Sequence, residues 1–399
     1  MKRILFYYDN FCGENSKGGT EVATFRIAKA LKDTGDFQVY QAFRRKHDLS
    51  EKSLYSDIIK LSSSYKSFER ELKEFITKHD IEIVVNMSRF FRHKVIVNAI
   101  QKSSKNVKVI FMQHFAPGSE IKKPTFTSGF HLLRLNPLNP VYWLRSSFYP
   151  LVKLPRQIQY SKKYREVYEM SDKVVLLSEG YVEDYCKIGR IYDASKFVAI
   201  PNIYETSDRK QQRNKGNGLL PKKEKRVLIL SRLDEIQKRL SLALKIWSNV
   251  EKDPDLSEWY LDIVGTGHNA DIVKRTVKKL GLNKVSIHGW QSPEPYLRRS
   301  SILMMTSEYE GLPLSILEAQ SYGCVPIAFD SFASLRDVVK TSETGVIVDR
   351  FGDIDDYTEK LKNLMHDDSY REKLSRATSG FTYKFSPEAV TEKWLKILI

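Results

Sequence analysis

Short apolar runs alternate with helical segments along the whole 399-residue chain, and this alternation constrains the fold more than any other feature. The first series of expected strands covers 4–8, 37–43, 81–85, 107–112, 174–177 and 197–200. The second covers 227–230, 260–264, 285–288, 302–305, 326–329 and 345–348. Continuous apolar strands separated by helices are typical of parallel sheets covered on both faces. The sequence therefore predicts an α/β fold with two doubly wound domains.

A polar stretch at 206–225 separates the two series and has the composition of a linker. We therefore expect an N-terminal domain over 1–205 and a C-terminal domain over 226–380. The remaining segment, 381–399, is expected to end in an amphipathic helix over 387–399. Within the first domain, the helix expected at 21–32 has apolar residues at Val22, Phe25, Ala28 and Leu31.

The net charge of +16 is concentrated in one segment. Residues 121–165 contain nine Lys or Arg and no Asp or Glu, interleaved with aromatic residues and leucines. Such a mixture suits an anionic membrane surface or a lipid-linked acceptor, although its prolines argue against one long amphipathic helix. The alternative is a basic surface loop whose aromatic residues belong to the core.

Composition excludes an integral membrane protein. A hydrophobic share of 41% and a charged share of 29% are ordinary for a soluble protein, and no window holds the ~20 apolar residues of a membrane span. The three cysteines have no metal-ligand spacing and suit a reducing compartment. A cytoplasmic protein is expected, peripheral at most on the inner face of the cell membrane.

Two glutamates eight positions apart, Glu310 and Glu318, lie between two of the expected strands. A Gly-Leu-Pro sequence follows the first, and proline suits the start of a helix, where its missing N–H costs nothing. The next N–H groups, at Leu314 and Ser315, would face an anion such as a diphosphate. Glu318, about one turn into the helix, can accept hydrogen bonds from sugar hydroxyls. The alternative is an ordinary strand–helix–strand unit with two solvated glutamates.

Two cations follow the strand at 227–230. Arg232 comes directly after this strand and Lys238 six positions later, so both charges are expected over one binding site. A leaving nucleoside diphosphate needs such neutralisation as its bond to the sugar breaks. Arg239, beside Lys238, is an alternative cation, and a surface helix with ordinary ion pairs is the other interpretation.

Two features of the first domain also lie at strand ends. Gly18 and Gly19 precede the first helix, where paired glycines allow close approach to a phosphate or sugar. Capping of that helix by Thr20 or Glu21 explains the same residues equally well. His114 follows the strand at 107–112, where it would line a ligand site, although a lone histidine is more often structural.

The segment from Glu310 to Glu318 resembles the E-x7-E motif of retaining glycosyltransferases with the GT-B fold, and its flanking residues resemble glycosyltransferase family 4. The segment from Arg232 to Lys238 is similar to that family's G-R-L-x(n)-K-G sequence. Ser231 and Arg239 replace its two glycines. The resemblance is specific over 226–349 and implies two Rossmann-like domains facing across a cleft, with the C-terminal helix crossing back onto the first domain.

The resemblance implies a role for each of these side chains. Arg232 and Lys238 would hold the donor diphosphate, Glu318 would bind the ribose hydroxyls, and Glu310 the hydroxyls of the donor sugar. His114 would contact the transferred sugar.

Four glycines and a tryptophan would complete the site. Gly18 and Gly19 would face donor and acceptor, whereas Gly265, Gly267 and Trp290 would lie near the nucleotide base and ribose. Packing between the two domains is an alternative role for Trp290 that explains it at least as well.

The implied reaction is retaining transfer of a sugar from a nucleotide diphosphate, a UDP-sugar above all, to a hydroxyl of a glycan or lipid-linked glycan in bacterial surface polysaccharide synthesis. No cofactor and no metal are expected, and the Asp-x-Asp sequences at 253–255 and 353–355 are interpreted as turns. The base, the donor sugar, the acceptor and the choice between same-face attack and a covalent intermediate stay open.

Two other functions remain in view. One is a different GT-B enzyme, such as a nucleotide-sugar epimerase. The other is a basic, non-catalytic protein that binds a membrane or nucleic acid, although no nucleic-acid-binding module is present in the sequence.

Overall fold

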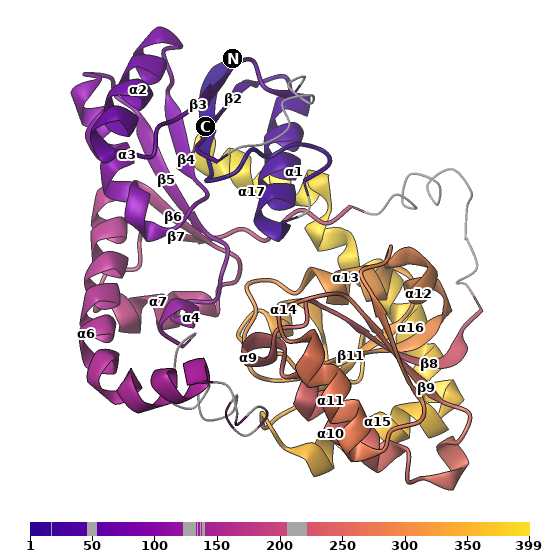
Figure 1. The fold of residues 1–399 in the computed structure, drawn as a ribbon. Helices are drawn as coiled ribbons and strands as arrows, with labels where there is room; N and C mark the ends of the chain where they lie inside the picture. Colours follow the sequence, from indigo (N-terminus) through magenta and orange to yellow (C-terminus); the bar gives the residue numbers. More distant parts are fainter. Residues whose placement is uncertain are drawn as a thin grey trace. The chain divides into compact units, whose positions relative to one another are not determined.

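The computed structural model describes residues 1–16, 18–45, 54–122, 140–205 and 222–399, together with 133, 135 and 137 (Figure 1). The chain divides into two compact units. The first contains 1–118, 154–203 and 385–399, and the second contains 119–153 and 204–384. Most of the expected linker, 206–221, lies outside the described residues.

The first unit is built on a seven-stranded parallel sheet with the order β3-β2-β1-β4-β5-β6-β7. Its strands are β1 (Lys2–Tyr7), β2 (Phe37–Phe43), β3 (Ile58–Lys60), β4 (Ile83–Asn86), β5 (Lys108–Gln113), β6 (Lys173–Leu176) and β7 (Phe197–Ala199). Only β3, three residues at the sheet edge, was not expected from the sequence, because its two isoleucines are followed directly by a lysine and are only half-buried.

Helices cover both faces of this sheet (Figure 1). They are α1 (Gly19–Asp33), α2 (Tyr65–Lys78), η2 (Phe90–Arg92), α3 (His93–Lys102), the later part of α6 (Pro140–Met170), α7 (Tyr181–Gly189) and α17 (Pro387–Leu398). α2 contacts α3, and α1 contacts α17. Lys2 Nζ also donates to the carbonyl of Leu398 at 2.8 Å, so the last helix is part of the first unit.

The buried face of α1 is rotated from the predicted one. Ala28 and Leu31 are buried as expected, but Val22 and Phe25 are only half-buried, and Ala23 takes their place in the core. The apolar spacing alone did not fix the face because α1 is covered by α17 as well as by its own sheet.

α6 corrects a second expectation. A single helix runs from Pro140 to Met170 in spite of its internal prolines. Pro140 occupies the first position, where proline is tolerated. Pro155 lies on an exposed stretch, where water can reach the carbonyl that a proline leaves without a donor. Among the side chains of this helix that the structure describes, the buried ones, Tyr164, Val167 and Tyr168, lie in its last turns.

The second unit is built on a six-stranded parallel sheet with the order β10-β9-β8-β11-β12-β13. Its strands are β8 (Glu224–Leu230), β9 (Tyr260–Val264), β10 (Val285–Gly289), β11 (Ser300–Met305), β12 (Val325–Phe329) and β13 (Val346–Val348). Every strand of the second predicted series is present, although β8 begins inside the segment that was expected to be linker.

Its helices also form two layers (Figure 1). Their bounds are α9 (Glu235–Lys238), α10 (Leu240–Val250), η3 (Pro254–Leu256), α11 (Ala270–Leu280), α12 (Glu294–Arg299), α13 (Leu314–Ser321), α14 (Leu335–Val338), α15 (Ile354–His366), α16 (Asp368–Phe381) and η4 (Thr382–Phe385); the short α4 (Ser119–Lys122) precedes them in the chain. α10 contacts α11 and α15, whereas α13 contacts α16. Both units are therefore doubly wound α/β domains, and the predicted fold class is confirmed.

Candidate functional site

The strand order of the second sheet places its ligand-binding edge. Strand order reverses between β8 and β11, which are neighbours in the sheet although far apart in sequence. Open α/β sheets bind ligands at such a switch point, outside the carboxyl ends of the strands. Here the two loops are 231–239, after β8, and 306–313, after β11. They contain three of the four predicted catalytic residues.

Lys238 and Glu310 form an ion pair between these loops. Lys238 Nζ lies 2.5 Å from Glu310 Oε1, and the two side chains are only 14% and 9% exposed. The amide of Gln237 donates to Glu310 Oε2 and to the carbonyl of Tyr309, both at 3.1 Å. Each carboxylate oxygen of Glu310 thus has a donor from the first loop.

Arg232 lies at the open side of the same loop. Its side chain is 57% exposed, and its guanidinium lies 3.4 Å from Asp234 Oδ2 and donates to Gln237 Oε1 at 3.0 Å. The other carboxylate oxygen of Asp234 caps α9 through the N–H groups of Ile236 and Gln237. The structure thus brings Arg232, Lys238 and Glu310 together around Gln237.

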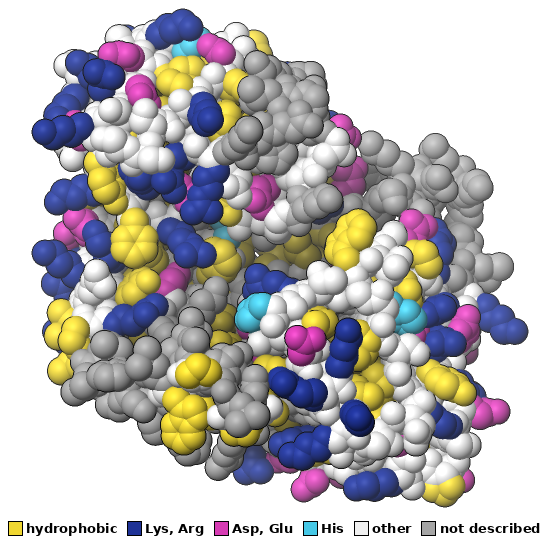
Figure 2. All heavy atoms as spheres, in the orientation of Figure 1, with side chains coloured by type: hydrophobic (Ala, Val, Ile, Leu, Met, Phe, Trp, Pro, Cys, Tyr) yellow, Lys and Arg dark blue, Asp and Glu magenta, His cyan; other side chains and the backbone are white. Residues whose placement is uncertain are grey.

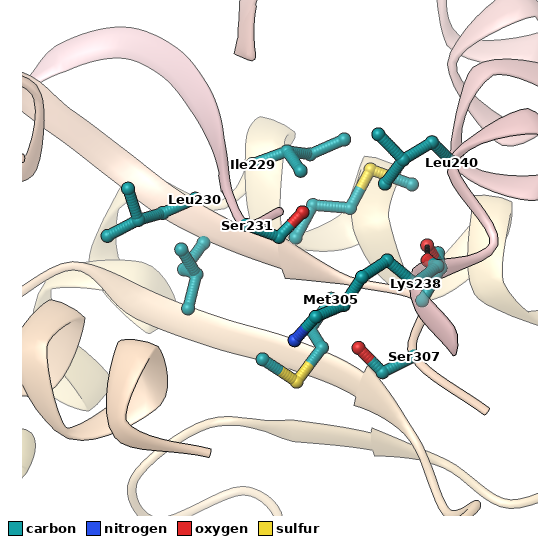
Figure 3. Close-up of a pocket in the computed structure, with 10 residues that line it drawn as sticks. Ile229, Leu230, Ser231, Lys238, Leu240, Met305 and Ser307 are labelled. Carbon is teal, nitrogen blue, oxygen red and sulfur yellow. Dashed lines mark hydrogen bonds between the residues drawn. The ribbon is translucent and has the colours of Figure 1, made fainter. Parts of the chain in front are cut away.

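A small pocket lies beside Lys238, lined by the ends of β8 and β11 (Figure 3). In Figure 3 the side chains of Ser231, Lys238 and Ser307 turn toward one space, with Met305 beneath them. The pocket is therefore lined by both polar and apolar side chains.

The glycines after β9 are explained by backbone packing. A Cβ on Gly265 would lie 1.9 Å from the carbonyl oxygen of Ser231, and one on Gly267 would lie 2.3 Å from that of Leu233. Gly265 also has a φ of +140°, which favours glycine. The Leu233 N–H donates to the carbonyl of Thr266 at 2.9 Å. This turn therefore holds the loop that carries Arg232.

α13 begins at Leu314, directly after Pro313, so the proline lies at the start of the helix as predicted. Leu314 and Ser315 are its first two residues, so their N–H groups precede the first intrahelical bond. Glu318 is half-buried on this helix, and its carbonyl accepts from Ser321 Oγ at 2.7 Å.

The turn after β10 carries two different environments. Trp290 is 68% exposed. His288 is paired with a buried carboxylate, since its Nε2 lies 2.6 Å from Oδ1 of the fully buried Asp262. Burial would raise the pKa of Asp262, but the hydrogen bond from His288 and the charges of Arg299 and Arg226 outweigh it and lower that pKa.

In the first unit, His114 follows β5 and is buried. Neither ring nitrogen makes a hydrogen bond of normal geometry with the described residues. Its pKa is lowered to about 4, because burial outweighs the opposing effect of the nearby Asn202 amide. The imidazole is therefore neutral at pH 7 and can donate from one nitrogen and accept at the other.

The two glycines before α1 differ. A Cβ on Gly18 would lie 1.5 Å from Glu21 Oε2, so a carboxylate of the chain itself covers that glycine. The other oxygen of Glu21 accepts from Asn10 Nδ2 at 2.6 Å. Gly19 has no such neighbour within 4 Å and is open to a ligand.

No group of three or more His, Cys, Asp or Glu side chains in the described ranges is arranged to hold a metal. The two Asp-x-Asp sequences have structural roles: Asp253 caps η3 and Asp353 caps α15. Among the described residues, no helix is both long and apolar enough to cross a membrane.

Gln237 is the member of the cluster that sequence reasoning missed. It lies directly before Lys238 and contacts Arg232, Tyr309 and Glu310. Nothing in its type or spacing marks it, because its importance comes from the approach of two loops more than 70 positions apart in sequence.

Residues 210–380 match the family of glycosyl transferases group 1. The match covers 171 of the 399 residues, all of them after the first predicted domain. An amylovoran biosynthesis glycosyltransferase, AmsD of Erwinia amylovora, is 28% identical over 236 residues, which is 58% of this chain and 63% of the relative. A further relative, a poly(glycerol-phosphate) alpha-glucosyltransferase of Bacillus subtilis, is 27% identical, over 59% of this chain and 34% of its own length. The alignment thus spans less than two thirds of either relative.

Similarity of fold extends over the whole chain. The lipopolysaccharide outer core galactosyltransferase WaaB superposes with a TM-score of 0.70 at 17% identity, covering 99% of this chain and 98% of the other. Anabaena Alr3699/HepE, solved in complex with UDP-glucose, gives 0.71 at 14% identity, covering 100% and 99%. At these identities the comparison shows the fold, which is the GT-B arrangement of two Rossmann-like domains.

Proposed function

We propose that this protein is a glycosyltransferase that moves a sugar from a nucleotide diphosphate to a hydroxyl of a glycan or lipid-linked glycan during surface polysaccharide synthesis. The observation that carries the proposal is the pairing of Lys238 with Glu310 at the switch point of the second sheet, beside Arg232. A cation so placed suits a leaving diphosphate, and a carboxylate suits the hydroxyl groups of a sugar.

Each residue then has a defined task. Arg232 and Lys238 neutralise the diphosphate, and the N–H groups of Leu314 and Ser315 add partial positive charge. Glu318 accepts from the ribose hydroxyls, and Glu310 from the donor sugar once Lys238 has moved to the diphosphate.

The remaining predicted residues are assigned to the base, the sugar and the acceptor. Trp290 is exposed and stacks on the base, while Gly265 and Gly267 shape the turn beside it. His114 hydrogen-bonds the transferred sugar, and Gly19 allows close approach of substrate at the start of α1.

A UDP-sugar is the favoured donor, because several similar structures were solved with UDP or UDP-glucose. The acceptor class follows from relatives named for amylovoran, lipopolysaccharide and poly(glycerol-phosphate). Retention of configuration and independence from metal follow from the E-x7-E resemblance and from the two cations that take a metal's place.

The first test is isothermal titration of the protein with UDP, GDP and their sugars in EDTA. UDP should bind, and both Arg232→Ala and Glu318→Ala should weaken binding about tenfold or more, since a hydrogen bond to a charged group is worth about 1.5–3 kcal/mol. A folded protein that binds no nucleotide would overturn the proposal and favour a non-catalytic basic binding protein. The anomeric proton of the product, followed by NMR, reports retention.

The membrane is the proposed location of the acceptor. Leu154 and Ile158 of α6 are 64% and 60% exposed, and the lysines at 153 and 162 near them are exposed as well. Figure 2 shows dark blue side chains more widespread than magenta ones where α2, α3 and α6 form the surface, with hydrophobic side chains between them. A mixed basic and apolar surface suits an anionic lipid layer.

Sedimentation with phosphatidylglycerol vesicles tests this location. Lys153→Glu combined with Lys162→Glu should lower the partition coefficient at least tenfold, because each basic residue near such a surface contributes about 1 kcal/mol. Lys340→Glu, an exposed lysine of the second unit, is the matched control. Unchanged binding of the double variant would exclude this surface.

A further inference from the structure

A second ion pair joins the two loops of the second unit, directly beside the first. Arg239 Nε lies 2.7 Å from Glu308 Oε2, and the terminal Nη2 of the same guanidinium contacts the same oxygen. The two side chains are 13% and 27% exposed. Arg239 follows Lys238, and Glu308 precedes Glu310 by two positions, so the two pairs run in parallel.

The backbone at Arg239 is unfavourable for an arginine. Its φ is +52° and its ψ is +45°, the left-handed region that glycine adopts at little cost. Arg239 ends α9 and begins α10, so this conformation sets the turn that follows Lys238. Since a glycine would fit the turn more easily, the side chain must contribute something that offsets the backbone strain.

The remaining contacts between the loops are few. Glu308 N–H donates to the carbonyl of Gln237 at 2.8 Å, and Thr306 Oγ1 donates to the carbonyl of Lys238 at 2.9 Å. These bonds hold the backbones together at Thr306 and Glu308. The Gln237 amide and the two ion pairs add side-chain contacts from the first loop to Glu308 and Glu310.

The two pairs differ in what a donor would do to them. A diphosphate competes with Glu310 for Lys238, because both are anions seeking the same ammonium. Arg239 is held by Glu308 through a planar guanidinium with two N–H groups on one oxygen, a geometry that a point charge such as lysine does not reproduce.

We propose that Arg239 is a positioning residue: its ion pair with Glu308 keeps the loop of Glu310 in place while Lys238 leaves Glu310 for the donor diphosphate. This inference rests on the proposed function. It separates an exchangeable pair, Lys238–Glu310, from a permanent one, Arg239–Glu308, within the same site.

The test compares Arg239→Gly, Arg239→Lys and Glu308→Gln with the wild-type protein, using UDP affinity by titration calorimetry, kcat and KM for the UDP-sugar, and the urea midpoint of unfolding. Arg239→Gly removes the pair and relieves the strained turn, so we expect its urea midpoint to stay near wild type. Its UDP affinity should fall about tenfold and its kcat by at least as much. Glu308→Gln should lower UDP affinity and kcat to a similar extent. Arg239→Lys should have a UDP affinity and a kcat between those of Arg239→Gly and wild type.

Arg371 of α16 supplies the matched control. Its side chain is also 13% exposed and paired with a carboxylate, that of Asp368, but it holds the end of α15 through the carbonyls of Leu364 and Met365. Arg371→Ala should lower the urea midpoint and leave UDP affinity unchanged, which shows that lost stability alone does not weaken binding.

The outcomes separate the two proposals. If the wild-type protein binds no nucleotide, the proposed function fails and this inference fails with it. If the wild-type protein binds UDP and Arg239→Gly binds it equally well with the same kcat, only the role of Arg239 is overturned.

Discussion

The two units share a topology but differ in the chemistry at the carboxyl edges of their sheets. Both sheets have the parallel order in which the third, second, first and fourth strands are neighbours. In the second unit the loops at this edge carry paired charges, with Lys238 on Glu310 and Arg239 on Glu308. In the first unit the corresponding edge holds a buried, neutral histidine, His114, and the open glycine Gly19.

Two sheets of the same topology can therefore present different chemistry, because the loops at their edges differ. In the proposed function, the charged loops suit a diphosphate, whose binding exchanges one ion pair for another. A neutral imidazole, which can both donate and accept, suits hydroxyl groups.

The largest effect is expected from removing a charge at the second edge. Lys238→Ala should lower kcat about 10²–10³-fold, the usual loss when one group that stabilises a leaving anion is removed. A coupled assay that detects the UDP released from the UDP-sugar measures kcat. Lys340→Ala should keep the wild-type rate. A loss below threefold in Lys238→Ala would mean that the charged edge is not the reaction site.

Glycine-to-alanine substitutions at the two sheet edges should differ in their effect on the free energy of unfolding. Gly265→Ala should destabilise the protein by about 2–4 kcal/mol, because its Cβ would overlap a backbone carbonyl that cannot move alone. Gly19→Ala, with open space around it, should change the free energy of unfolding by less than about 1 kcal/mol. Urea unfolding measures both. If Gly19→Ala also raises KM without loss of stability, substrate uses the open side of that glycine.

The two units should lose stability in different pH ranges. His114 and His93 of the first unit have their pKa lowered from 6.5 to about 4, in each case by burial. The unfolded chain therefore takes up protons that the folded one refuses, so the free energy of unfolding is highest above pH 6.5 and falls as the pH drops toward 4. For each histidine, the free energy of unfolding should fall by about 2 kcal/mol between pH 8 and pH 5.

In the second unit the lowered pKa of Asp262 acts in the same direction but at lower pH. Its contribution is complete above the ordinary value of 3.8 and is lost only as the pH falls below it. Urea unfolding of wild type and His114→Gln at pH 8 and pH 5 tests the contrast. An equal loss of stability in both proteins would show that His114 is protonated in the folded state.

The smallest effect is expected at Glu318. Glu318→Gln should raise KM for the UDP-sugar about fivefold, because a hydrogen bond to a charged acceptor exceeds one to a neutral amide by about 1 kcal/mol. The comparison of UDP with 2′-deoxy-UDP identifies the partner. Wild type should discriminate between them more strongly than Glu318→Gln, and equal discrimination would remove Glu318 from the ribose site.

The fold was largely predictable from the sequence because its strands are buried on both faces and therefore appear as continuous apolar runs. The observed bounds of β2 and β9 are the same as those of the predicted strands, 37–43 and 260–264. The single helix α6 was not predictable, because the penalty of a proline depends on its position in the helix and on access of water to the freed carbonyl.

The site was predictable only in part. The sequence marked Arg232, Lys238 and Glu310, and the structure brings these three together. It did not mark Gln237, nor did it resolve which of two adjacent cations pairs with Glu310. Both depend on which side chains meet when loops 72 positions apart approach each other, and local patterns carry no such information. The roles of Glu318, His114, Trp290 and the glycines stay predictions.

The helix α17 has a consequence for how the chain is made. Its buried residues Val390 and Trp394 complete the first unit, where the helix packs on α1. On the ribosome, α1 emerges early but waits for its covering helix until residues 387–398 have been synthesised. The continuous stretch 204–384 of the second unit is finished before that. The unit that is begun first is therefore completed last, and during synthesis one apolar side of α1 is a natural place for a chaperone to bind.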